Sequence, residues 1–246
     1  FGLARELAAL TGAPVTAPLA LPSSAEKTAS PQEIRLEAAD GCPLYTARII
    51  RGITVKPSPD WLQARLQSIG RRPIDDSVDI ADYVLPELGS PLHAFDLAKL
   101  DGGITVRRAT DGETFQALDG SGQVLDVNDL VIADRSKALA IAGVMGGMDS
   151  GVIEGTTDIL LESAYFAPAG IRRTARRLGL SSDSSYRFER GVDPRNARNA
   201  SALATKLILE IAGGTADPEL LVAGEPPPLT GDVTLDEDRA LKLLGI

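Results

Sequence analysis

One carboxylate stands inside an otherwise apolar segment, and it is the residue most able to recognise a polar ligand. Glu162 lies within residues 160–166, Leu-Leu-Glu-Ser-Ala-Tyr-Phe, shortly after the glycine-rich run 141–148. Burying a carboxylate without a partner is costly. Glu162 therefore either pairs with an arginine in a structural role or faces a pocket, where it accepts a hydrogen bond. Glycines allow backbone to approach a ligand closely, so such a pocket suits a small polar molecule.

The only histidine, His93, is the second candidate for chemistry. It lies in residues 89–96, Gly-Ser-Pro-Leu-His-Ala-Phe-Asp, after a turn set by proline, and we expect it near the surface of a loop. It could position a water or a ribose hydroxyl, or it could tie the loop by hydrogen bonds. Cys42 has no basic neighbour and no nucleophile elbow is present, so no catalytic triad is predicted. One histidine and one cysteine also argue against a zinc site, and no metal is expected.

A third candidate is a basic helix over residues 169–180. Three apolar residues share one of its faces by their i, i+4, i+7 spacing. In a chain of net charge −9, the opposite face is the main basic cluster. It could contact phosphates, or it could be a solvated face paired with acids. This face carries Arg172, Arg173, Arg176 and Arg177.

The glycine run 143–147 has two interpretations. It is not a phosphate-binding loop, because it lacks the Gly-Lys-Ser/Thr ending. It could form the close wall of a binding site, or it could be a β-bulge or hairpin turn.

Composition limits the remaining possibilities. A chain of 246 residues that is 43% apolar can bury one large core or two small ones. The net charge of −9 excludes a whole-surface grip on nucleic acid. A single cysteine excludes an internal disulfide, so a reducing cytoplasm is the default expectation.

Strands clustered between helices predict an α+β fold. A helix is expected over 58–70, capped by Ser58 and burying Trp61, Leu62, Leu66 and Ile69. Asp-Gly pairs at 111–112 and 119–120 predict hairpin turns. Further helices are expected over 77–88, 168–179 and 196–212, around short strands within 103–166.

Six segments, in order over about residues 42–215, resemble the beta subunit of bacterial phenylalanyl-tRNA synthetase around its editing module. They are 42–52 (CPLYTARIIRG), 57–62 (PSPDWL), 89–96 (GSPLHAFD), 142–147 (AGVMGG), 160–164 (LLESA) and 186–194 (YRFERGVDP).

The resemblance implies a domain organisation. The fold would be a β-barrel-like core with an inserted α/β part. The implied boundaries are 1–12 for the end of a preceding helical domain, 13–33 for a linker, 34–222 for the editing module, and 223–246 for a second linker and the start of a following helical domain.

The resemblance also implies an activity, hydrolysis of tyrosine wrongly esterified to the phenylalanine tRNA. An apolar pocket cannot strongly reject an analogue that merely adds a hydroxyl, so a second site must select the error. Glu162 falls on the family's glutamate for that hydroxyl, and His93 on a histidine that would position the water or the terminal ribose. Further substrate-binding positions implied are Ala142, Gly143, Gly146, Asp82 and Ser184.

Two positions depart from the family pattern. Ala81-Asp82 stands where the family usually has Thr-Asn, so Asp82 brings a charge where an amide is expected. Ser184 stands where many members have alanine.

The resemblance extends to partners. It implies the alpha subunit in an α2β2 enzyme, tRNA(Phe), and ATP and Mg²⁺ for aminoacylation in the alpha subunit, with no cofactor in this fragment. Two other interpretations stay open: a non-catalytic module that joins subunits, and a free-standing deacylase.

Overall fold

A computed structural model describes residues 2–15, 25–27, 33–228 and 234–245, which form a mixed α+β fold. The helices are α1 (Gly2–Thr11), α2 (Asp60–Ser68), α3 (Asp76–Leu88), α4 (Pro168–Leu178), α5 (Asp183–Phe188), α6 (Asn196–Ile211) and α7 (Glu237–Leu244), with a 3₁₀ turn, η1 (Leu97–Lys99). None of these helices combines the length and the apolar character that a membrane crossing needs.

The central sheet has six strands, in the order β1-β13-β3-β11-β4, with β12 also paired to β3. β3 and β11 run antiparallel along their whole lengths and are almost entirely buried. Strands covered on both faces are continuously apolar rather than alternating, which explains their Ile- and Leu-rich sequences. The strands are β1 (Ala25–Lys27), β3 (Leu44–Arg51), β4 (His93–Asp96), β11 (Asp158–Tyr165), β12 (Thr215–Ala216) and β13 (Glu219–Gly224).

A second sheet of five strands has the order β10-β9-β8-β5-β2, and β6 and β7 form a two-stranded sheet. The predicted α+β class is confirmed. Within the described residues the five-stranded sheet stays open, so a barrel-like core is not confirmed. These strands are β2 (Ile34–Leu36), β5 (Ile104–Arg108), β6 (Thr114–Gln116), β7 (Gly122–Val124), β8 (Leu130–Ala133), β9 (Ala138–Ile141) and β10 (Met145–Gly146).

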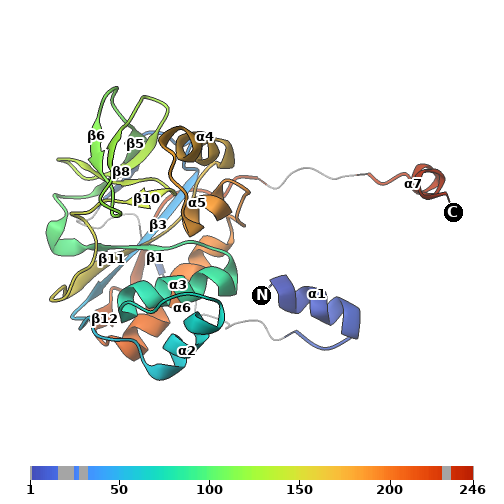
Figure 1. Cartoon of the computed structure of the whole chain (residues 1–246), viewed down its shortest axis with the longest axis horizontal. Helices are drawn as coiled ribbons and strands as arrows, with labels where there is room; N and C mark the ends of the chain where they lie inside the picture. Colours follow the sequence, from blue (N-terminus) through green and yellow to red (C-terminus); the bar gives the residue numbers. More distant parts are fainter. Residues whose placement is uncertain (1, 16–24, 28–32, 229–233, 246) are drawn as a thin grey trace.

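Two hydrophobic cores lie on opposite faces of the central sheet. One contains Ile159 and Leu161 of β11 and packs against α2, α3 and α6. The other contains Leu160 and Ala164 and packs against the five-stranded sheet and α4. Figure 1 shows α2, α3 and α6 gathered on one side of β3 and β11, with β5, β8 and β10 on the other. The alternation of side chains along β11 thus decides which core each residue enters.

The start of α2 differs from the prediction. The N-cap residue is Pro59, whose side chain has no acceptor, and the predicted cap Ser58 instead donates its hydroxyl to Asp79 at 2.6 Å. Trp61 and Ile69 were expected in the core but are 47% and 53% exposed. Trp61 packs edge-to-face on Tyr83 of α3, at 5.8 Å between ring centroids.

One predicted hairpin is confirmed and one is wrong. Asp119-Gly120 lies in the turn between the paired strands β6 and β7. Asp111-Gly112 lies between β5 and β6, which belong to different sheets, so its turn closes no hairpin. The other three predicted helices are present as α3, α4 and α6.

The outer segments bury little. Neither α1 nor α7 contains a buried residue. Most of the predicted linker 13–33 lies outside the described residues, and so does 229–233 of the second. The described part of the first includes β1, which pairs in parallel with β13.

The glycine-rich run forms the turn of a hairpin between β9 and β10. Gly143 has a φ of +67°, in the left-handed region that favours glycine. A Cβ at this position would lie 2.9 Å from Phe166, 3.0 Å from Ile171 and 3.1 Å from Phe188. Backbone conformation and tight core packing therefore both require glycine here.

Gly143→Ala should destabilise the protein by about 2–4 kcal/mol, because it adds left-handed strain to overpacking of three large side chains. Urea unfolding followed by circular dichroism measures the difference. Gly170→Ala is the matched control, since Gly170 lies in α4 and a Cβ added there would meet no atom within 4 Å; it should stay within ~1 kcal/mol of wild type. Equal stability of Gly143→Ala and wild type would contradict the close packing.

Candidate functional site

Glu162 lies at the centre of a row that crosses three adjacent strands. On β11 it is directly opposite Ala47 of β3 on one side and His93 of β4 on the other. Residues directly opposite in antiparallel strands project to the same face of the sheet. This is the face that packs on the five-stranded sheet, because Leu160 and Ala164 belong to that core.

The Glu162 carboxyl is buried without a cation. Its residue is 6% exposed, and Oε2 has no hydrogen-bond partner among the described residues. Burial raises the pKa of Glu162 to about 8, and a contact with the hydroxyl of Tyr45 opposes that rise. No ion pair to Glu162 is formed within the described residues, so the arginine-paired alternative is wrong. The carboxyl is poised to hydrogen-bond something other than this chain.

His93 lies in a strand, not in the surface loop that its proline-set turn predicted. It is the first residue of β4, and its ring packs edge-to-face on Phe95, at 4.5 Å between centroids. Nε2 is buried and has no hydrogen-bond partner in the described part of the chain. Burial lowers the pKa of His93 to about 4. The imidazole is therefore neutral at pH 7, with one nitrogen free to bind a ligand or a water.

A small pocket of about 60 Å³ joins the two unpaired groups. A water requires roughly 15 Å³ of such space, so the pocket has room for a few waters but not for an aromatic ring without movement of its walls. A Cβ at Gly146 would lie 2.8 Å from Cε1 of His93, so glycine is required beside the ring. The predicted residues that line the pocket are His93, Gly143, Gly146, Glu162 and Ser184.

Two predicted residues lie elsewhere. Ala142 is 1% exposed and belongs to the core rather than to the pocket lining. Asp82, on α3, also does not line the pocket; its carboxylate pairs with Arg71. The charge that replaces the family's amide is thus neutralised by an arginine outside the pocket.

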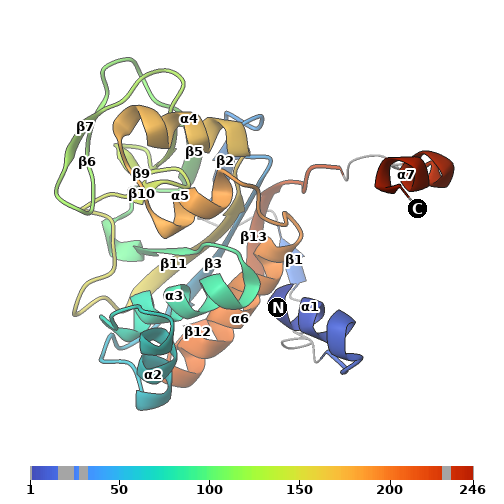
Figure 2. The same ribbon diagram turned by 45° about the vertical axis from the view of Figure 1, so that its right-hand side comes forward.

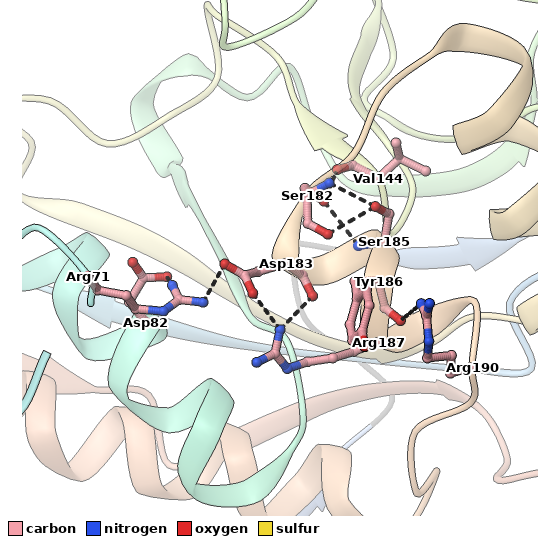
Figure 3. Close-up of polar contacts among 9 residues, drawn as sticks. All are labelled: Arg71, Asp82, Val144, Ser182, Asp183, Ser185, Tyr186, Arg187 and Arg190. Atoms are coloured by element: carbon pink, nitrogen blue, oxygen red, sulfur yellow. Dashed lines mark hydrogen bonds and ion pairs between the residues drawn. The ribbon is translucent and has the colours of Figure 1, made fainter. Parts of the chain in front are cut away.

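The short helix α5 supplies one wall of the pocket through Ser184. Its N-cap, Ser182, forms a reciprocal capping box with Ser185. The Ser182 hydroxyl also donates to the carbonyl of Val144 at 2.7 Å. Figure 3 shows this contact between the start of α5 and the glycine turn. The two walls are therefore joined directly to each other.

Arg71 joins α5 to α3. Its guanidinium pairs with Asp82 and, at 2.6 Å, with Asp183, the first residue of α5. Asp183 also pairs with Arg187 at 2.7 Å (Figure 3). The side chain of Arg71 is 17% exposed and that of Asp183 is 57% exposed, so the bridge is shielded from solvent mainly at its arginine end. The bridge adds a second constraint on the position of α5.

A larger hollow is less suited to be the site. About 560 Å³ lies between the β6–β7 hairpin and residues 136–139. None of the predicted site residues lines it, and neither does any buried side-chain atom that lacks a hydrogen-bond partner among the described residues.

The arginines on the basic face of α4 fall into two groups, one paired within the protein and one exposed to solvent. Figure 2 shows α4 and α5 beside β9 and β10. Arg177 is engaged by Asp126, at 3.1 Å, and by Asp129, so it fixes α4 to the loop before β8. Arg172, Arg173 and Arg176 are exposed. Within the described residues, Arg172 and Arg176 form no ion pair, so their charges are available to a partner.

Sequence reasoning missed three contributors to this region: Tyr45, Arg71 and Ser182. Tyr45 is spaced by two from Ala47 and shares its face of β3, but only the strand register brings it near Glu162. Ser182 followed by Ser185 is a capping pattern that could have been recognised. No sequence signal identifies the partners of Arg71.

Glu162→Gln should change how stability depends on pH. Between pH 4.5 and about 8 the unfolded chain ionises at Glu162 while the folded protein stays protonated there, so wild-type stability falls as pH rises. The full effect is about 5 kcal/mol at ~1.4 kcal/mol per pH unit. Urea unfolding should therefore show that the free energy of unfolding of the variant rises relative to that of wild type from pH 5 to 8.

Glu154→Gln, at an exposed position, corrects for the loss of one charge. A difference between wild type and Glu162→Gln that is independent of pH would show that the Glu162 carboxyl titrates as it does in the unfolded chain.

The family model described as the B3/4 domain matches residues 41–213. A phenylalanine–tRNA ligase beta subunit from Syntrophus aciditrophicus is 49% identical over 87% of this chain and 27% of its own length. The subunit from Chlorobium luteolum is 48% identical over 99% of this chain and 30% of its own length. The chain thus spans less than a third of the length of these relatives.

A solved N-terminal fragment of the phenylalanyl-tRNA synthetase beta subunit from Pyrococcus horikoshii aligns with 92% of this chain and 63% of its own, at 13% identity. Its TM-score of 0.49 is too low to establish a shared fold. The family match covers β3, β4 and β11 of the central sheet, the pocket and α4 to α6. The chain therefore belongs to the B3/4 domain family, and its predicted resemblance to phenylalanyl-tRNA synthetase beta subunits is confirmed.

Proposed function

We propose that the pocket hydrolyses tyrosine esterified in error to tRNA(Phe), as the editing part of a larger synthetase subunit. The observation that carries the proposal is the pairing of Glu162 and His93 on adjacent strands, each with a buried polar atom that has no partner among the described residues. Buried polar groups are nearly always hydrogen-bonded, so two such atoms at one pocket point to a polar ligand.

Glu162 would provide selectivity. A carboxyl that accepts a hydrogen bond from the tyrosine hydroxyl is left unpaired by phenylalanine, and an unpaired buried group costs about 1–3 kcal/mol or more when charged. The site would therefore bind the error and reject the correct product. This is the discrimination that an apolar synthetic site cannot provide.

His93 would position a water or the terminal ribose rather than activate the water as a general base. An imidazole with a pKa of about 4 is a weak base at pH 7, far from the matched value that favours general-base catalysis. Its unpaired Nε2 can hold a water or the terminal ribose beside the ester. The proton acceptor would then come from the substrate, with a hydroxyl of the tRNA as the candidate.

The remaining roles extend the same proposal. Arg172, Arg173 and Arg176 would contact tRNA phosphates. The alpha subunit would complete an α2β2 enzyme and carry aminoacylation with ATP and Mg²⁺. Because the pocket is small, its aromatic substrate requires a wall to move. If α5 is that wall, its movement has to break the side-chain contacts that join it to the glycine turn and to Arg71.

The chain, and the synthetase assembled with it, should deacylate tyrosyl-tRNA(Phe) and spare phenylalanyl-tRNA(Phe). Glu162→Ala should reduce that preference by about tenfold, because the loss of one buried hydrogen bond costs about 1–3 kcal/mol. Release of labelled amino acid from each ester measures both rates, with circular dichroism as the control for folding. Background rates on both esters would favour a non-catalytic scaffold. A preference that persists in Glu162→Ala would remove its selective role.

The double charge reversal Arg172→Glu and Arg176→Glu should weaken tRNA binding, most strongly at low salt. The slope of log K against log salt should fall by about 1–2, because each lost phosphate contact contributes roughly 0.7–0.9. Filter binding over a salt series measures it. The double reversal Arg65→Glu and Lys206→Glu, on α2 and α6, is the control that makes the same change in net charge. An unchanged slope in the double variant would make the face a solvated surface.

A further inference from the structure

The phenol of Tyr45 is an unusual feature of the core beneath the pocket. Tyr45 is 0% exposed, yet its hydroxyl has no hydrogen-bond partner among the described residues. A buried tyrosine hydroxyl normally finds a partner, since leaving it unpaired costs free energy. Its position therefore requires an explanation.

Strand register places this hydroxyl against Glu162. Tyr45 is directly opposite Ala164, two residues beyond the Ala47–Glu162 pair, so it is the diagonal neighbour of Glu162 on the pocket face. Aromatic side chains reach across that diagonal. Burial and the neighbouring Glu162 carboxyl both raise the pKa of the Tyr45 phenol, and Tyr45 itself does not line the pocket. The phenol therefore belongs to the core beside Glu162 and not to the lining of the pocket.

The surroundings offer Glu162 little else. Cys42, in the turn before β3, directs its thiol to the carbonyl of Leu44 at 3.5 Å, and burial raises the pKa of that thiol. His93, across on β4, is neutral at pH 7. Ser184 and the glycine turn contribute no titratable side chain to the pocket. Strand register thus leaves the Tyr45 phenol as the side-chain donor placed within reach of the carboxyl.

We propose that Tyr45 is a positioning residue for Glu162: its phenol donates to one carboxyl oxygen and leaves the other free for the hydroxyl of a bound phenol. The identity of that ligand rests on the proposed function, whereas the contact between Tyr45 and Glu162 does not. Tyr45 thereby favours the ionised carboxylate, the stronger acceptor, in a site where burial favours the neutral acid.

Tyr45→Phe tests the contact directly, because it removes one oxygen and keeps the ring in the core. The titration midpoint of Glu162, followed by ¹³C NMR of the labelled carboxyl, should move upward from about 8. Tyr83→Phe is the matched control, since Tyr83 packs on Trp61 and lines neither the 60 Å³ pocket nor the 560 Å³ hollow. An unchanged midpoint in Tyr45→Phe overturns the proposal.

The same variant tests selectivity. The preference for the tyrosyl over the phenylalanyl ester should fall by about tenfold, through a higher KM for the tyrosyl ester with kcat retained. An unchanged preference overturns the proposal even if the midpoint moves. If wild type hydrolyses neither ester, the proposed function fails, and the midpoint alone decides on Tyr45.

A second modification guards against failure of Tyr45→Phe to fold. Site-specific 3-fluorotyrosine at position 45 keeps the hydroxyl and makes it a stronger donor. The Glu162 midpoint should then move downward, opposite to the effect of removing the hydroxyl. No movement overturns the proposal.

Discussion

Burial of Glu162 without a cation is the constraint on which the pocket depends. The carboxyl lies on a strand covered on both faces, so water cannot reach it from the sheet and must be replaced by polar groups beside it. An arginine there would fill the pocket and satisfy both oxygens. The chain instead offers a phenol from the core side and leaves the pocket side free, so the cost of burial becomes a preference for a hydroxyl.

The second constraint is that small residues surround this group for different reasons. Gly146 gives room to the His93 ring, whereas Gly143 is required by its left-handed backbone and by three large neighbours in the core. Ala142 is small because it is inside that core. One run of small residues in the sequence therefore serves ring placement, turn geometry and packing, and only part of it borders the pocket.

Much of the fold could be predicted, because helices α3, α4 and α6 and the strands around the pocket have clear local patterns. Trp61 could not be placed, since its exposure depends on Tyr83 from another helix. His93 was expected in a loop because of the proline-set turn before it. Pairing of β4 with β11 overrides that local signal and places His93 in a strand. Glu162 could be identified as a candidate from the sequence. Whether it faces a pocket or pairs with an arginine depends on the residues that the fold places beside it. Tyr45 and Arg71 depend on contacts between segments far apart in the chain, which no local pattern encodes.

The central sheet is shared by two cores, and this has a consequence for cooperativity. β3 and β11 contribute alternate residues to the helical side and to the pocket side. The helical layer therefore cannot melt while the pocket layer persists, because both lose the same strands. Folding of the whole body should be a single transition, with no stable subdomain that retains only the pocket. Substitutions beneath α6, far from any ligand, are thus coupled to the integrity of the hydroxyl-reading face.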